Sequence, residues 1–75
     1  MDFNRAALLR AREDAELTQE QLAVKAGCAF TTVNRLEGGK ISSPSFGTIA
    51  KLADALEVDV ADLLILDDDK DGAAA

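Results

Sequence analysis

Residues 17–40 decide the fold, and they read LTQEQLAVKAGCAFTTVNRLEGGK. This stretch predicts a helix, a turn of three residues and a second helix that stops at two adjacent glycines. A turn that short does not let two helices lie flat against each other. We therefore expect the helices to cross steeply and the second one to protrude from the domain.

The ends of both helices are marked by specific residues. Thr18 and Gln21 fit the capping box, in which each side chain satisfies a free backbone amide of the other residue. Gly27 supplies the left-handed conformation that ends a helix, and the second helix is expected over residues 30–37. Two helices joined in this way form a helix-turn-helix, which presents one helix to the major groove of DNA.

The remaining sequence predicts three more helices, so the expected fold is all-α, with five helices and no strands. Apolar spacing places the first at residues 4–15 and the fourth from Pro44 or Ser45 to Leu56. In the fourth, Phe46 is expected in the inward apolar stripe. Asp59 is expected to cap a fifth over residues 60–65. We expect one domain over 1–66 and a disordered acidic tail over 67–75.

Charge is distributed unevenly along the 75 residues, whose net charge is −6. Residues 1–40 hold six basic and six acidic side chains, whereas residues 41–75 hold two basic and eight acidic ones. The half that contains the helix-turn-helix is therefore neutral. Overall acidity does not exclude binding to nucleic acid, because the excess charge lies in the other half.

Composition argues against several classes of protein. The chain has one cysteine and no histidine, which excludes an internal disulfide and makes a nitrogen or sulfur metal site or a histidine-based catalytic triad unlikely. No apolar run approaches the length needed to span a bilayer. We expect a cytoplasmic, non-enzymatic protein with no cofactor, no metal and no membrane partner.

Taken together, the motif resembles the DNA-binding domains of the lambda-repressor and Cro family, also called the XRE family. The resemblance runs from Leu8 to Leu64. Its matching positions are Arg12, Leu17, Thr18, Gln19, Leu22, Ala23, Gly27, Val33, Leu36, Glu37, Gly39, Lys40, Pro44, Ile49, Leu52, Ala53, Leu56, Val58, Leu63 and Leu64. It implies a compact helical domain that binds double-stranded DNA, usually as a homodimer.

The resemblance also implies which side chains face DNA. On the outward face of the second motif helix, the expected base contacts are Phe30, Thr31, Asn34 and Arg35. Phe30 departs from the polar residue usual in the family, and it contacts either a thymine methyl or a partner protein. The plain alternative is a solvated helix face.

Phosphate contacts are expected at Gln19, Thr32, Gly38 and Lys40. Gln19 lies in a first helical turn, where free amides and the helix dipole favour an anion. Its amide also reaches the second motif helix, which the family uses to brace the base-reading residues; an ordinary polar residue is the alternative. Gly38, Gly39 and Lys40 are expected to present backbone amides, together with the Lys40 ammonium.

Other residues have structural roles by resemblance. Arg12 and Glu37 match a buried salt bridge between the first and third helices, and Cys28 is expected to fill the core rather than sense redox state. The apolar run that ends the domain either closes the core or forms a dimer seam, and we favour the seam. Its expected dimer contacts are Leu64, Ile65 and Leu66.

Several positions depart from the family pattern. Ala29 stands where a capping Ser or Thr is common, and Glu16 and Glu57 stand where Gly often follows a helix. The segment Ile41–Ser45 has no basic residue where cations would bind phosphate. We therefore expect few phosphate contacts per subunit.

Two functions remain open on the sequence alone. The first is a transcriptional regulator, more often a repressor than an activator, that binds an inverted-repeat operator as a homodimer. The second is a protein-interaction adaptor on the same fold, such as an antitoxin that binds a basic toxin and has weak or partner-dependent DNA binding. The acidic half, Phe30 and the sparse phosphate contacts support the second.

Overall fold

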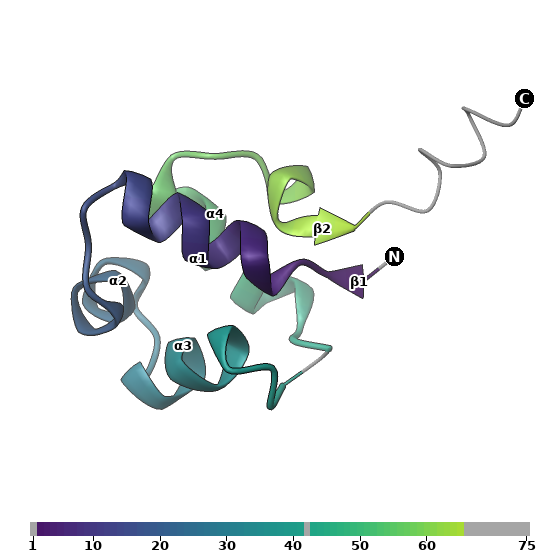
Figure 1. Ribbon diagram of the computed structural model, residues 1–75, viewed down its shortest axis with the longest axis horizontal. Coiled ribbons are helices and arrows are strands. Elements are labelled where there is room, and N and C mark those ends of the chain that lie inside the picture. The colour runs from purple at the N-terminus through teal and green to yellow at the C-terminus, as the bar shows by residue number, and fades with distance from the viewer. Residues whose placement is uncertain (1, 42, 66–75) are drawn as a thin grey trace, which may run out of the picture.

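The computed structural model describes residues 2–41 and 43–65 (Figure 1). In chain order its elements are β1 (Asp2–Phe3), α1 (Arg5–Asp14), α2 (Gln19–Ala26), α3 (Phe30–Glu37), α4 (Phe46–Leu56), the 3-10 helix η1 (Val60–Leu63) and β2 (Leu64–Ile65). The expected acidic tail over 67–75 lies outside the described residues. No helix in the described ranges has the length and apolar character needed to cross a bilayer.

The core forms where each helix contributes its apolar face to the same centre. Because all the helices meet there, the side chains that become fully buried come from α1, α2, α3, α4 and η1 alike. They are Leu8, Leu22, Val33, Leu36, Leu52 and Leu63. Each such burial stabilises the fold by roughly 1.5–3 kcal/mol relative to an exposed side chain.

The helix-turn-helix has the predicted boundaries. Thr18 Oγ1 accepts a hydrogen bond from the amide of Gln21 at 3.0 Å, and Gln21 Oε1 accepts one from the amide of Thr18 at 2.9 Å, which confirms the capping box. Gly27 ends α2 with a left-handed φ of 73°. In Figure 1, α2 is seen nearly end-on while α3 lies across the view, so the two helices cross steeply.

The expected fifth helix over residues 60–65 is present only as the shorter 3-10 helix over Val60–Leu63, and the expectation of no strands is wrong. The helix after Asp59 is a 3-10 turn of four residues, and Leu64 leaves it with an extended backbone. The cause is pairing across the domain, because Phe3 lies opposite Leu64 and Asp2 opposite Ile65 in an antiparallel ladder. Figure 1 shows the two strands side by side at the end of the domain.

Two glutamates take the left-handed conformation that usually belongs to glycine. Glu16 has φ 59° in the link from α1 to α2, and Glu57 has φ 58° just after α4. Both positions end a helix, which agrees with the glycine that the family often places there. The chain therefore carries local backbone strain at two helix ends.

Candidate nucleic-acid interface

The outward face of α3 is a row of exposed side chains over a buried apolar face. Val33 and Leu36 point into the core with no exposed surface. The residues that the sequence assigned to base contacts are all exposed, and they are Phe30, Thr31, Asn34 and Arg35. Phe30 is 46% exposed and is one of five large apolar side chains that the described part of the chain leaves exposed.

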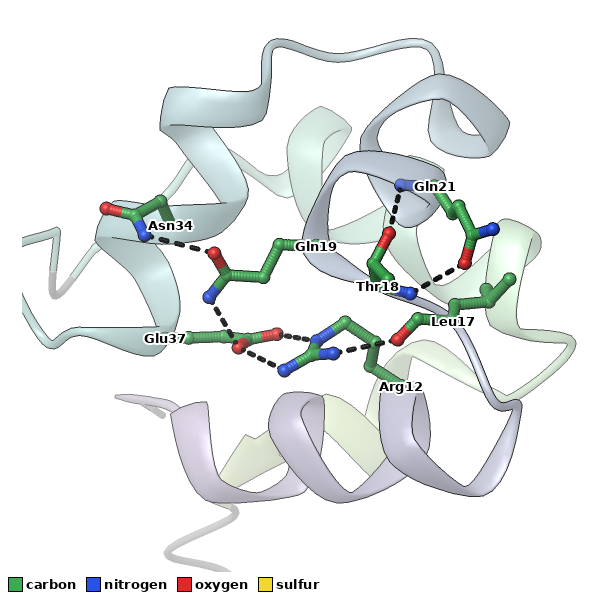
Figure 2. A network of polar contacts seen from close by, with 7 residues as sticks. All are labelled: Arg12, Leu17, Thr18, Gln19, Gln21, Asn34 and Glu37. Atoms are coloured by element: carbon green, nitrogen blue, oxygen red, sulfur yellow. Dashed lines mark hydrogen bonds and ion pairs between the residues drawn. The ribbon is translucent and has the colours of Figure 1, made fainter.

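A chain of polar contacts ties this row to the body of the domain (Figure 2). Asn34 Nδ2 donates to Oε1 of Gln19 at 3.0 Å, and Gln19 Nε2 donates to Oε1 of Glu37 at 2.9 Å. Arg12 completes the chain with a bidentate contact to Glu37, at 2.6 Å from Nε and 3.0 Å from Nη2. Residues from α1, α2 and α3 therefore hold Asn34 in one orientation.

The ion pair of Arg12 and Glu37 is shielded, with side chains only 14% and 5% exposed. Arg12 Nη1 also donates to the carbonyl of Leu17 at 2.7 Å, so this guanidinium joins α1, the link to α2 and the end of α3. Its hydrogen bond to Glu37 raises the pKa of Arg12 above the ordinary value, against the opposing effect of burial. Each of its three guanidinium nitrogens donates to a partner within the domain, which favours a structural role.

The segment after α3 departs from expectation. The amides of Gly38, Gly39 and Lys40 donate to carbonyls of α3, from Asn34 at 2.9 Å, Leu36 at 3.3 Å and Arg35 at 2.9 Å respectively. The expectation that these amides are free to bind a phosphate is therefore wrong, because they close the last turn of the helix. Lys40 itself has an exposed side chain, which leaves its ammonium accessible from solvent.

The other two phosphate candidates have different surroundings. Gln19 is half-buried and uses both polar atoms of its amide in the network, which agrees with the bracing role. Thr32 is half-buried on α3, with its amide bonded to the carbonyl of Ala29 at 3.0 Å. Ala29 itself provides no side-chain cap to α3.

Cys28 lies half-buried in the turn of the motif, where it packs against the core. Burial raises the pKa of its thiol, while the positive charge of Lys51 acts weakly in the opposite direction. A raised pKa lowers the thiolate fraction at neutral pH, so the thiol is less reactive than a free one.

The apolar run at the end of the domain divides between core and surface. Leu63 is fully buried, Leu64 packs against the core, and Ile65 is 45% exposed; Leu66 lies outside the described residues.

Sequence reasoning placed Phe46 in the inward stripe of α4, but it is 67% exposed because it is the first residue of that helix. Phe46 lines a groove with Phe3, Pro44 and Leu64.

Sequence reasoning also missed a cation beside this interface. Arg5 begins α1, and its guanidinium lies against Gly39 in the segment after α3. The spacing held a signal, because Arg5 precedes Arg12 by two helical turns and so lies on the same side of α1.

Among the described residues, no group of acidic and cysteine side chains is arranged to hold a metal ion.

The family model of a helix-turn-helix domain matches residues 5–64, most of the chain. The chain belongs to this family, in its XRE branch. This helix-turn-helix domain is 43% identical over 47 residues to the transcriptional repressor RghR of Bacillus subtilis (strain 168), a match that covers 63% of this chain and 35% of that protein. The domain thus spans about a third of the length of that relative.

Solved structures of helix-turn-helix proteins superpose on the domain. One is a SinR protein/SinI protein complex, with a TM-score of 0.74 and 25% identity over 89% of this chain and 70% of that one. Another is a hypothetical transcription factor, NHTF from Neisseria, with a TM-score of 0.72 and 27% identity over 92% of this chain and 83% of that one.

Proposed function

We propose that this helix-turn-helix domain belongs to a sequence-specific DNA-binding transcriptional regulator that acts as a repressor. The observation that carries the proposal is the exposed row on α3, braced by the network from Arg12 to Asn34. A braced, polar helix face matches what the major groove requires. The similarity to the repressor RghR supports the direction of regulation.

The bracing assigns a defined task to Asn34. Its Nδ2 donates one hydrogen bond to Oε1 of Gln19, so Oδ1 and the second N–H of the amide are left to face a base. An acceptor at that position pairs with the N6 amino group of adenine or the N4 amino group of cytosine. Arg35 forks onto guanine, and Thr31 and Phe30 contact a neighbouring base edge and a thymine methyl.

The domain acts as a homodimer on an inverted repeat, with half-sites about 34 Å apart. Ile65 and Phe46 support the dimer, because both are large, apolar and exposed near the β1–β2 ladder. Leu64 and Leu66 belong to the same seam. Occupancy of the operator then blocks polymerase, while Lys40 and Thr32 hold the DNA backbone.

Selection from a random-sequence duplex library tests this function. We expect the chain to enrich a two-fold symmetric motif, and Arg35→Ala to lose discrimination at one base pair per half-site by about 1–3 kcal/mol. Arg10→Ala is the matched control, because Arg10 is an exposed cation on α1, away from α3. A library that enriches no motif at low salt would remove the proposal.

A second candidate is an adaptor that binds a basic protein, such as an antitoxin with its toxin. Two observations favour it: residues 43–65 carry Lys51 as their one cation among four acids, and Phe30 is exposed. The superposable SinR protein was solved in complex with the SinI protein. A basic partner that binds the wild type but not Phe30→Ala supports this function, whereas equal binding by both removes Phe30 from it.

A further inference from the structure

Arg5 and Arg12 reach the end of α3 from the same side of α1. They are seven residues apart, which is close to two turns of helix, so their side chains lie one above the other. Arg12 meets Glu37 in the last turn of α3, and Arg5 meets Gly39 just beyond it. Both arginines therefore extend from α1 toward the end of α3 and the segment after it, where Gly38 and Lys40 were predicted to contact phosphate.

Gly39 makes room for the Arg5 guanidinium. A Cβ at residue 39 would lie 3.1 Å from Cζ of Arg5, nearer still to Nη1, and 3.6 Å from Cδ. The left-handed φ of 78° favours glycine at this position, and a side chain there would also displace the flexible end of Arg5. The guanidinium is seated over the backbone of the segment rather than extended away from it.

The charge of Arg5 falls where this segment lacks cations. Between α3 and α4, residues 38–45 contain Lys40 as their single basic residue, and Ile41, Ser43 and Ser45 are uncharged. Among residues 2–41 and 43–65 the one ion pair is that of Arg12 with Glu37, so no described carboxylate lies within ion-pair distance of Arg5; Asp2 lines the same pocket. Two exposed cationic residues therefore adjoin Gly39: Arg5, whose side chain lies against it, and Lys40, which follows it in the sequence.

We propose that Arg5 is a phosphate-binding residue of the DNA interface, where its guanidinium lies against the backbone at Gly39. The proposal rests on the proposed DNA-binding function and adds a contact from α1 that the sequence motif does not contain. The guanidinium fork suits two phosphate oxygens, and Lys40 contacts the same stretch of backbone as a point charge.

The salt dependence of DNA binding tests this proposal. The slope of log K against log salt is negative, and each lost phosphate contact reduces its magnitude by about 0.9. With fluorescence anisotropy on a mixed-sequence duplex, we expect Arg5→Gln to reduce the slope by about 0.9 per subunit, and Arg5→Lys to keep it near the wild-type value. Arg10→Gln, which removes the same charge from another side of α1, should leave the slope unchanged. Thermal melts identify any variant that is not folded.

Two glycine variants distinguish the contact with Arg5 from the effect of backbone strain. Gly39→Ala and Gly27→Ala both place a side chain at a positive φ, but only the first meets Arg5, since a Cβ at residue 27 has no neighbour within 4 Å. We expect both to lower stability and only Gly39→Ala to lower the slope. A wild-type slope in Arg5→Gln overturns this inference, while loss of discrimination in Arg35→Ala still upholds the proposed function. No binding by the wild type at low salt overturns both.

Discussion

Gln19 and Glu37 are joined by a hydrogen bond of 2.9 Å from Nε2 to Oε1, and that same carboxylate oxygen accepts Nη2 of Arg12 at 3.0 Å. One carboxylate thus serves the shielded ion pair and the side chain that orients Asn34. Stability of the domain and orientation of Asn34, the proposed base contact, therefore depend on the same carboxylate. Substitutions at Gln19 and at Arg12, the two residues that contact Glu37, should therefore change orientation and stability separately.

Replacing Gln19 tests the orienting effect. We expect Gln19→Ala to cost about 1 kcal/mol of stability, since the ion pair survives. It should relax base preference at the Asn34 position, because the Asn34 amide is then free to rotate. Competition binding with single-base variants of the selected site measures this, with the exposed neighbour Glu20→Ala as control. Unchanged preference in Gln19→Ala would show that Asn34 does not depend on the brace.

Replacing Arg12 tests the ion pair. Arg12→Ala leaves the Glu37 carboxylate shielded without its cation, and we expect a loss of about 3 kcal/mol in the free energy of unfolding. Urea denaturation measures the loss, and the exposed Arg10→Ala should change stability by less than about 0.5 kcal/mol. Equal unfolding midpoints for the two variants would contradict a stabilising pair.

Two helix caps in the motif predict changes of opposite sign. Thr18→Ala removes the cap of α2 and should destabilise the domain by about 1 kcal/mol. Ala29→Ser adds a missing cap to α3 and should stabilise it by about 0.5–1 kcal/mol, since Ala29 already has the extended backbone of a cap, with φ −77° and ψ 146°. Thermal melts of both variants check the signs, and a shift in the same direction for both would refute the capping account.

The left-handed conformation of Glu57 predicts that glycine at this position increases the stability of the domain. Glu57→Gly relieves a left-handed residue and should raise stability by up to about 1 kcal/mol. Glu13→Gly places the same substitution inside α1, where it should cost about 1 kcal/mol. Denaturant midpoints measure both, and a destabilised Glu57→Gly would indicate that the glutamate side chain outweighs the strain.

The raised pKa of Cys28 predicts how its reactivity depends on pH. Folding favours the protonated thiol, so its contribution to stability is intact below the unfolded pKa of about 8.5 and declines as pH rises through the higher folded value. At pH 7.5 we expect a maleimide to label the native chain more slowly than the urea-unfolded chain. Equal labelling rates would contradict the shift in the thiol pKa.

Local signals in the sequence were sufficient to predict the helix-turn-helix. The Thr18 capping box, Gly27 and the 30–37 boundary follow from hydrogen bonds and backbone preferences within a few residues, which is why they could be predicted without a tertiary structure. The outward position of Asn34 and Arg35 likewise follows from helical spacing against Val33 and Leu36.

Contacts between distant residues required the tertiary structure. The end of the domain became a 3-10 turn and a strand because Phe3 pairs with Leu64, and Phe46 is exposed because α4 begins there. The amides of residues 38–40 donate hydrogen bonds to carbonyls of α3 and are not free to bind an anion. Arg5 reaches Gly39 only because α1 crosses the end of α3. Short-range hydrogen bonding thus determined the motif from sequence, whereas strand pairing and helix crossing, which join residues far apart in the chain, were decided by the packing of the whole domain.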